Sequence, residues 1–430
     1  MNKNDSERAA ALLEGLGFSS KDKPEDSDLV IINTCSVRQT AEDRVYGMVE
    51  KLAKLKEKNS HFVLAVMGCM PGRDKDGSLR KKLPAVDFFF PTARITELPK
   101  WIAETFPEIV NSDVLAEDYL KLAPKRETRV SGYLTIQTGC NYFCTYCVVP
   151  FARGLERNRP VADILEEARA LAESGCLEIT LLGQTVNSFR AADPENFSKN
   201  NPYHDHFAAL LWEINQIPGI SRVHWTAPHP RHMTDEVINA LALPKQVNFL
   251  HLPVQSGDNE ILRKMNRRYK AEEYLELVEK INARRPGIAL GTDIIVGFCG
   301  ETEEQFARTV ELYKKADFDI AFLAMYSPRS GTAAKTAFAD TVPREEKRRR
   351  WRVLQDLMEE IVLAKNQKFV GNTAEVLVDK CDSRGPAQIC LGNSNEMKVV
   401  QFNGTPDDVG KIVKVKITKA REWVLEGTKI

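Results

Sequence analysis

The sequence lacks a net charge, a long apolar run and a signal segment, and each absence excludes a class of protein. Its 430 residues include 60 Lys or Arg and 60 Asp or Glu, so attraction to a nucleic acid must come from local patches and not from the whole-chain field. No apolar run approaches the roughly 18 residues that a membrane span requires, and residues 1–6 do not resemble a secretory signal. We therefore expect a cytoplasmic protein with no membrane partner.

The nine cysteines are informative because a reducing compartment disfavours disulfides. Clustered cysteines in such a compartment become candidates for metal ligands. Three others stand apart from any cluster, and we expect them to be packing residues: Cys176, Cys381 and Cys390.

Composition and periodicity divide the chain into three segments, with expected boundaries at 1–105, 126–358 and 361–425. In the first, helical and apolar strand-like stretches alternate, which predicts an open α/β domain of the flavodoxin-like type. The expected strands are residues 29–32, 62–67 and 87–90, and the expected helices are 6–14 and 40–58. Such a domain normally begins with a strand, and here a helix comes first, so the first strand is missing from the sequence.

The second segment contains six strand candidates, each followed by helical sequence: 134–137, 178–182, 222–226, 249–252, 291–296 and 320–325. Six βα units predict a partial (βα)6 barrel with its site at the carboxyl ends of the strands. A long charged helix is expected at 344–365. In the third segment, period-two alternation at 374–378 and 413–417 predicts a small antiparallel β-barrel, in the size class of oligonucleotide-binding barrels.

Three cysteines at C-x3-C-x2-C spacing directly follow the first strand of the expected barrel: Cys140, Cys144 and Cys147. Three thiolates on one loop can hold three irons of a 4Fe–4S cluster and leave the fourth iron open. A structural zinc site would need a fourth ligand, and no further Cys or His lies nearby in the sequence. An RNA-binding protein with a structural metal loop is the non-enzyme alternative.

This spacing, on the first strand of a six-unit barrel, resembles the radical S-adenosylmethionine (SAM) enzymes. The resemblance implies that the open iron binds the amino and carboxylate groups of SAM, and that an electron from the cluster cleaves SAM to a 5′-deoxyadenosyl radical. It makes Cys140, Cys144 and Cys147 the catalytic ligands. Tyr146 matches the aromatic position that packs near the adenine in that family.

Further motifs narrow the resemblance to the methylthiotransferases, and within them to the MiaB type that modifies tRNA. These motifs follow the family's order and occupy residues 140–154, 181–187, 251–257 and 292–301. The match extends to the α/β domain and to the C-terminal β-barrel, which is called TRAM in the family. Cys299 stands where the family commonly has proline, and we interpret it as a turn residue.

The resemblance implies addition of a methylthio group to C2 of N6-isopentenyladenosine at position 37 of tRNA, next to the anticodon. A methylthiotransferase acting on threonylcarbamoyladenosine, or on a small-subunit ribosomal protein, is the alternative. The chain is expected to work as a monomer with a flavodoxin or a ferredoxin as electron donor, and its sulfur donor is left open.

Cys35 and Cys69 each follow a strand candidate of the α/β domain, and the carboxyl ends of parallel strands line one crevice. In the family, cysteines at these positions hold an auxiliary 4Fe–4S cluster that carries the sulfur to be transferred. The family has a third cysteine, which would fall just before Met1, so the auxiliary cluster lacks one ligand in this sequence. We favour a misplaced start codon over a true loss of that cysteine.

Other polar residues near the expected barrel mouth are candidate SAM contacts. The resemblance assigns this role to Gln184, Asn187 and Asp293, whereas their chemistry alone indicates only polar groups near a site. Arg153 follows the cluster loop and is expected to face a phosphate or the SAM carboxylate. A structural role is favoured for His251, at the end of the fourth strand.

Two basic stretches are candidates for contact with tRNA. Residues 344–352 hold six basic residues, and the strand at 411–419 carries several lysines. Clusters of this kind can neutralise phosphates, although a solvated helix face is the alternative. The candidate residues are Arg348, Arg349, Arg350, Lys414 and Lys416.

Overall fold

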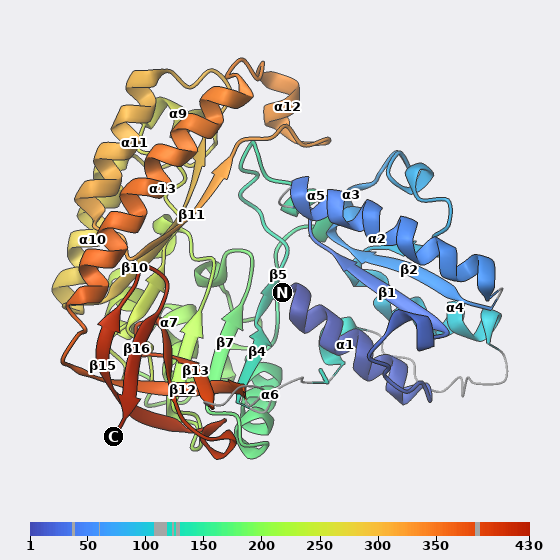
Figure 1. The fold of residues 1–430 in the computed structure, drawn as a ribbon, viewed down its shortest axis with the longest axis horizontal. Helices are drawn as coiled ribbons and strands as arrows, with labels where there is room; N and C mark the ends of the chain where they lie inside the picture. Colours follow the sequence, from blue (N-terminus) through green and yellow to red (C-terminus); the bar gives the residue numbers. More distant parts are fainter. Residues whose placement is uncertain (37–38, 60, 107–117, 123, 126–129, 383–387) are drawn as a thin grey trace. The chain divides into compact units, whose positions relative to one another are not determined.

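The computed structural model describes residues 1–430 except 37–38, 60, 107–117, 123, 126–129 and 383–387. The chain forms two compact units, coloured along the sequence in Figure 1. The first unit comprises Met1–Glu127, Gln137–Arg157 and Ser327–Thr336, and the second comprises Thr128–Ile136, Asn158–Tyr326 and Ala337–Ile430. The expected domain boundary at residue 126 lies outside the described residues.

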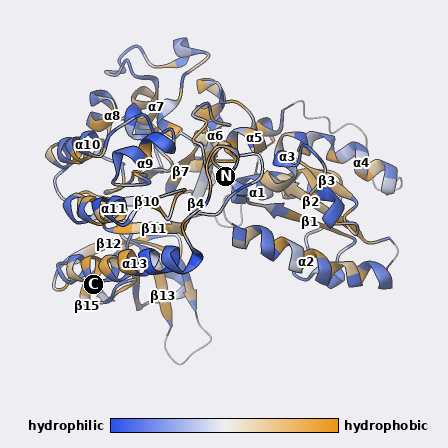
Figure 2. Cartoon of the chain, turned by 90° about the horizontal axis from the view of Figure 1, so that it is seen from above, coloured by the Kyte–Doolittle hydropathy of each residue, from blue (hydrophilic) through white to orange (hydrophobic). Residues whose placement is uncertain are grey.

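The first unit contains a parallel three-stranded sheet of order β1-β2-β3. Its elements are α1 (Asn2–Gly15), β1 (Leu29–Thr34), α2 (Gln39–Lys58), β2 (Val63–Gly68), α3 (Cys69–Arg73), β3 (Phe88–Phe90) and α4 (Leu98–Thr105). In Figure 2 the strands of this sheet are largely hydrophobic and helix α2 is largely hydrophilic. The structure therefore confirms the open α/β fold that the sequence predicts.

Strand β2 is buried along its whole length because helices cover both faces of the sheet. Alternate residues of β2 enter two different hydrophobic clusters. One cluster contains Val63, Ala65 and Met67 together with residues of α1 and α4. The other contains Leu64 and Val66 together with residues of α2. This packing fixes the carboxyl ends of β1 and β2. A predicted cysteine ligand directly follows each of these two strand ends.

The second unit contains the six expected parallel strands in two three-stranded sheets, ordered β4-β7-β8 and β11-β10-β9. The strands are β4 (Ser131–Thr135), β7 (Glu178–Leu182), β8 (Arg222–Trp225), β9 (Phe249–His251), β10 (Ala289–Val296) and β11 (Ile320–Met325). The helices are α6 (Val161–Glu173), α7 (His206–Gln216), α8 (Asp235–Ala240), α9 (Asn259–Lys264), α10 (Ala271–Arg284), α11 (Glu303–Ala316) and α13 (Arg344–Gln367). Four shorter elements lie in or at the edge of the segments that the first unit takes from this part of the chain: β5 (Gln137–Thr138), α5 (Val149–Arg153), β6 (Arg157–Asn158) and α12 (Ala333–Ala337).

Local sequence accounts for several of these helix starts. Side-chain oxygens accept hydrogen bonds from backbone N–H groups of the first turn in α7, α8, α9 and α11, which satisfies donors that the helix itself leaves unpaired. The capping residues are Asp205, Thr234, Asp258 and Thr302. None of the described helices combines the length and the apolar character needed to cross a membrane.

Strand β4 begins earlier than the sequence predicts. The apolar run suggested residues 134–137, whereas β4 pairs with β7 from Ser131 opposite Glu178 to Thr135 opposite Leu182. Pairing with a neighbouring strand, and not the local run of apolar residues, sets these bounds.

The C-terminal strands form a closed five-stranded barrel of order β12-β13-β14-β16-β15. They are β12 (Thr373–Asp382), β13 (Ile389–Asn393), β14 (Val399–Asn403), β15 (Ile412–Ala420) and β16 (Leu425–Lys429). The barrel closes through a parallel pair, β14 with β16, so the expectation of a wholly antiparallel barrel was wrong at this one seam. The other four pairings are antiparallel.

Cys381 and Cys390 pack in the core of the C-terminal barrel, as expected, but they also form a disulfide across β12 and β13, so the expectation that the cysteines form no disulfide was wrong here. The antiparallel register places them directly opposite each other, with their Cα atoms 4.0 Å apart. Cys176 is a packing residue, as expected, in the core between α6 and the barrel strands.

Candidate functional site

The three-cysteine loop is held by backbone hydrogen bonds within the first unit. Cys140 N–H donates to the carbonyl oxygen of Gly154 at 3.2 Å, and Cys147 N–H donates to that of Cys144 at 2.9 Å. The Cys147 sulfur accepts a hydrogen bond from the backbone N–H of Val149 at 3.4 Å. Cys140 is buried, whereas Cys144 and Cys147 are half-buried, so the loop presents its thiols at a sheltered but accessible place.

Gly139 explains how the chain turns into this loop so closely. Its φ of +77° lies in the left-handed region, and a Cβ there would lie 2.0 Å from the carbonyl oxygen of Leu155. Only a glycine fits between the strand and the returning chain. Phe143, between the first two cysteines, also has a positive φ of 48°. This tight conformation places the three cysteines on one short loop beside the returning chain.

Cys35 and Cys69 follow neighbouring parallel strands, as the sequence predicts. The last register pair of β1 and β2 is Thr34 opposite Gly68, and each cysteine is the next residue along the chain. Adjacent strands lie about 4.8 Å apart. A Cβ at Gly68 would lie 2.5 Å from the Thr34 carbonyl oxygen, so glycine allows the two strand ends to approach this closely.

The three-cysteine loop and the Cys69 helix pack directly against each other in the first unit. Helix α3 begins at Cys69, and helix α5 follows Cys147. A Cβ at Gly72 would lie only 2.1 Å from the carbonyl oxygen of Ala152, so the two helices touch through their backbones. In addition, Ala334 N–H donates to the carbonyl oxygen of Thr145 at 2.8 Å, which brings the segment after β11 to the loop.

Arg153 lies on the Cys69 side of this arrangement. Its Nη2 contacts a carboxylate oxygen of Asp5 at 2.6 Å and donates to Asn2 Oδ1 at 2.9 Å. Burial acts to lower the pKa of Arg153, but the charges of Asp5 and Cys69 more than offset this, and the pKa is raised above its usual value. The guanidinium is therefore a permanent cation beside the Cys69 thiol, and one of its nitrogens is committed to the start of α1.

A second buried network lies on the Cys35 side. Glu42 of α2 accepts two hydrogen bonds from Arg73 Nη2, both at 2.7 Å, and lies 3.3 Å from Arg329 Nη1. Arg329 Nη1 also donates to Gln39 Oε1 at 2.8 Å. Burial lowers the pKa of Arg329, while the charges of Glu42 and Cys35 act in the opposite direction. Two cations thus share the carboxylate of Glu42 near Cys35.

The five candidate cysteines fit iron–sulfur ligation because their thiol sulfurs are the usual ligands of such clusters. Outside the masked segments, no three Cys, His, Asp or Glu side chains are gathered closely enough to hold a metal ion in this structure. The fit therefore rests on three thiols of one glycine-bounded loop, and on two thiols at adjacent strand ends flanked by cations. Thiolate ligands carry negative charge, and buried guanidinium groups balance it.

The candidate SAM residues lie in the second unit and differ in their hydrogen bonding. Asn187 is committed to the backbone of His229, since its Nδ2 donates to the carbonyl oxygen at 3.0 Å and its Oδ1 accepts from the N–H at 2.8 Å. Gln184 Oε1 is buried without a hydrogen-bond partner among the described residues. Asp293 lies 3.2 Å from His251 Nε2. Of the three candidates, Gln184 is therefore the one with an unpaired acceptor oxygen, Oε1.

The candidate RNA contacts divide into exposed and buried residues. Arg350 is buried and bonded to Glu301 at 2.8 Å, so it does not lie on the exposed face of α13. Arg349 is exposed and ion-paired with Glu346 at 2.7 Å. Exposed positions with a basic side chain are Arg348, Lys414 and Lys416. The two lysines share the outer face of β15, because residues two apart on a strand point the same way.

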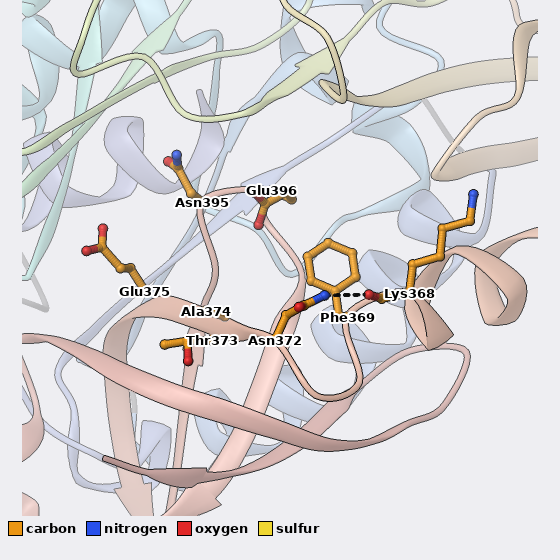
Figure 3. Close-up of a pocket in the computed structure, with 8 residues that line it drawn as sticks. All are labelled: Lys368, Phe369, Asn372, Thr373, Ala374, Glu375, Asn395 and Glu396. Carbon is orange, nitrogen blue, oxygen red and sulfur yellow. Dashed lines mark hydrogen bonds between the residues drawn. The ribbon is translucent and has the colours of Figure 1, made fainter.

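A cavity of about 430 Å³ lies where the end of α13 meets the C-terminal barrel. Figure 3 shows Phe369 and Asn372 beside it, with Asn372 Nδ2 donating to the Lys368 carbonyl oxygen at 2.8 Å. Glu375 and Glu396 also line it. No predicted site residue lines this cavity, and its two carboxylates disfavour an RNA phosphate.

Sequence reasoning did not identify Glu42, Arg73 and Arg329. Glu42 belongs to the expected helix at residues 40–58, and burial of a charged residue in such a helix depends on its tertiary partners. One signal was available for Arg329, which comes shortly after the sixth barrel strand, since residues beyond the carboxyl ends of barrel strands build the site in this fold.

Comparisons with known proteins agree with this architecture. Residues 134–313 match the family model described as the radical SAM superfamily, residues 1–91 match the uncharacterized protein family UPF0004, and residues 367–430 match the TRAM domain. Among solved structures, the radical S-adenosylmethionine methyltransferase TsrM from Kitasatospora setae superposes with a TM-score of 0.53 at 17% identity, covering 76% of this chain and 68% of that one. At this identity, the similarity indicates the fold alone.

Full-length relatives are much more similar in sequence. A tRNA-2-methylthio-N(6)-dimethylallyladenosine synthase from Carboxydothermus hydrogenoformans is 43% identical over 99% of this chain and 96% of its own length. A protein of the same name from Clostridium novyi is 40% identical over 99% of this chain and 94% of its own length. The cysteine loop, the barrel and the C-terminal domain agree with these matches, and the chain belongs to the tRNA-2-methylthio-N(6)-dimethylallyladenosine synthase family of radical SAM enzymes.

Proposed function

We propose that this protein is a radical SAM methylthiotransferase that adds a methylthio group to C2 of N6-isopentenyladenosine, next to the anticodon of tRNA. The observation that carries the proposal is the loop of Cys140, Cys144 and Cys147 within a chain that matches synthases of this name from end to end. The target C–H bond is neither acidic nor easily attacked by a nucleophile. A side-chain base therefore has no way to activate it, and radical chemistry is required.

Cys140, Cys144 and Cys147 would hold a 4Fe–4S cluster, and that cluster would supply the electron for reductive cleavage of SAM. Gly139 and the backbone hydrogen bonds of the loop hold the conformation of the segment that carries the three thiols. Its half-buried Tyr146 contributes an aromatic surface for the adenine.

The barrel residues bind and orient SAM. The unpartnered Oε1 of Gln184 accepts a hydrogen bond from a donor on SAM. Asp293 contributes a carboxylate that is already oriented by His251. Asn187 acts indirectly, since both ends of its amide hold the His229 loop in place. These roles divide the three candidates into two contact residues and one positioning residue.

Cys35 and Cys69 supply two ligands to an auxiliary 4Fe–4S cluster, which carries the sulfur that is transferred. The support is their position after adjacent parallel strands and the buried cations that flank them.

Exposed basic residues attract the phosphates of tRNA. Arg348, Lys414 and Lys416 are exposed, and the lysines lie on one face of β15 in the TRAM barrel. The target base reaches the site by leaving its stack in the anticodon loop, at a cost of a few kcal/mol. We place the protein in the cytoplasm as a monomer, with a flavodoxin or a ferredoxin as electron donor.

Nucleoside mass spectrometry of tRNA tests the substrate. The chain is expressed in a bacterium that lacks its own methylthiotransferase, and methylthio-isopentenyladenosine is expected. The matched control is Cys144→Ala, which removes one ligand of the SAM-cleaving cluster and should abolish both the product and the formation of 5′-deoxyadenosine.

Other results of this experiment identify the alternatives. Methylthiolated threonylcarbamoyladenosine, or a methylthiolated small-subunit ribosomal protein, would move the protein to a different substrate. Purified protein that contains zinc, lacks colour and leaves SAM intact would identify an RNA-binding protein with a structural metal loop. Product formation by Cys144→Ala would contradict the radical mechanism.

A further inference from the structure

Two buried arginines beside the auxiliary cysteines each have a guanidinium nitrogen without a partner. Arg153 and Arg329 are both 5% exposed. Nη1 of Arg153 and Nη2 of Arg329 are buried and have no hydrogen-bond partner among the described residues. Leaving a buried donor unpaired destabilises a fold, and more so when the group is charged. Such donors in a native fold require an explanation.

The partnered nitrogens show that neither guanidinium is loosely placed. Arg153 is held through Nη2 by Asp5 and Asn2, at 2.6 and 2.9 Å. Arg329 is held through Nη1 by Gln39 at 2.8 Å and by Glu42 at 3.3 Å. In each residue, the held nitrogen fixes the plane of the guanidinium, and the free nitrogen is therefore presented in a fixed direction.

The surroundings indicate what the free nitrogens bind. Arg153 interacts electrostatically with the Cys69 thiol, and Arg329 interacts with the Cys35 thiol. The two cysteines follow adjacent strand ends, so the two cations, which come from elements far apart in sequence, act on neighbouring thiols. An anion at that place would receive a charge-assisted hydrogen bond from each guanidinium.

We propose that Arg153 and Arg329 form a clamp for an anionic sulfur species, sulfide or methanethiolate, that is bound beside Cys35 and Cys69. This inference deepens the proposed function and rests on the auxiliary cluster. Each arginine donates its free N–H to the sulfur and lowers the energy of the negative charge there. Both act as positioning residues for the sulfur that is transferred, and no bond to either arginine is made or broken.

The test uses the full chain with Cys140, Cys144 and Cys147 replaced by alanine, so that auxiliary iron alone remains after anaerobic reconstitution. Iron and acid-labile sulfide are counted, and methanethiolate binding is titrated by electron paramagnetic resonance of the reduced cluster. We expect Arg329→Gln to bind methanethiolate about 10-fold more weakly, which corresponds to the loss of one charge-assisted hydrogen bond. Its reduction potential should also become more negative, because a nearby positive charge is lost.

Three further variants separate the clamp from general damage. Arg329→Lys keeps the charge and should bind with intermediate affinity, which also covers the case in which Arg329→Gln does not fold. The double variant Arg153→Gln with Asp5→Asn removes the second cation without leaving its carboxylate unpaired, and should weaken binding to a similar extent. The matched control is Arg157→Gln, because Arg157 is an exposed arginine of the same unit, 2.8 Å from Asp118. It should leave the affinity unchanged.

The outcomes distinguish this inference from the proposed function. Equal methanethiolate affinity in the parent and in Arg329→Gln, with iron present, would overturn the clamp and leave the auxiliary cluster standing. A parent chain that binds no iron after reconstitution would overturn the auxiliary cluster and the clamp together. Weaker binding of S-adenosyl-L-homocysteine to Arg329→Gln in the otherwise unmodified chain, with methanethiolate affinity unchanged, would assign the free nitrogens to the carboxylate of SAM instead.

Discussion

Replacing Glu178 by glutamine should make the stability of the second unit less dependent on pH. Glu178 begins β7 and is buried, and its Oε2 has no hydrogen-bond partner among the described residues. Burial raises the pKa of its carboxyl to about 7, although the charge of Arg222 acts in the opposite direction. The group is therefore protonated in the folded protein at a pH where it is already ionised in the unfolded chain.

The size of the effect follows from the two pKa values. Below pH 4.5, the carboxyl is neutral in both states and contributes nothing. As the pH rises from 4.5 to about 7, the folded state binds the proton that the unfolded state has released, so stability falls. Since each pH unit between the two pKa values corresponds to about 1.4 kcal/mol, ionised Glu178 costs roughly 3 kcal/mol at pH 8.

Urea unfolding of the metal-free protein at several pH values between 4.5 and 8 measures this cost. Glu178→Gln should match the original chain at the acid end and exceed its stability by roughly 3 kcal/mol at pH 8. Glu173→Gln is the control, because Glu173 is an exposed carboxylate at the end of the preceding helix, and its effect should be small throughout. A stability difference for Glu178→Gln that is constant from pH 4.5 to 8 would refute the assigned burial cost.

Three further predictions concern the pairing of α13, the cysteine loop and the TRAM surface. Arg350→Ala removes the cation paired with the buried carboxylate of Glu301 and should lower the free energy of unfolding by about 3–5 kcal/mol, as measured by calorimetry. Arg350→Lys should restore part of this loss. Gly139→Ala should reduce the iron content of the reconstituted protein by at least half, because the new Cβ would lie 2.0 Å from a backbone oxygen. A normal iron content would show that the loop tolerates the change. The double variant Lys414→Gln with Lys416→Gln should bind tRNA about 10-fold more weakly at low salt and show a shallower salt dependence. Equal affinity in a filter-binding titration would show that this face of β15 does not contact tRNA.

Much of the fold was predictable because its strands are buried and parallel. Such strands appear in a sequence as short continuous apolar runs, and β7 and β11 have the expected bounds. Knowing that Cys35 and Cys69 follow neighbouring strands was enough to predict that they lie close together. These inferences need only local patterns and one rule of sheet geometry.

The remaining features depend on pairings between distant segments, which local patterns do not contain. The pairing of Cys381 with Cys390 requires the register of β12 and β13. The burial of Arg329 requires a contact with Glu42, which lies almost three hundred residues away in sequence. Arg153 was predicted to be functional from its place after the loop, but its partner Asp5 follows only from the fold.

The composition of the first unit has a consequence for synthesis of the protein. This unit is not completed by its own N-terminal segment, since it also contains Gln137–Arg157 and Ser327–Thr336. The ribosome must therefore add roughly 200 residues after Glu127 before Arg329 can meet Glu42, which takes about 10–40 s at 5–20 residues per second. During this time the carboxylate of Glu42 and the thiols of Cys35 and Cys69 lack the cover that the later segments supply. We therefore expect iron and sulfide to enter this unit late in synthesis, after most of the barrel has left the ribosome.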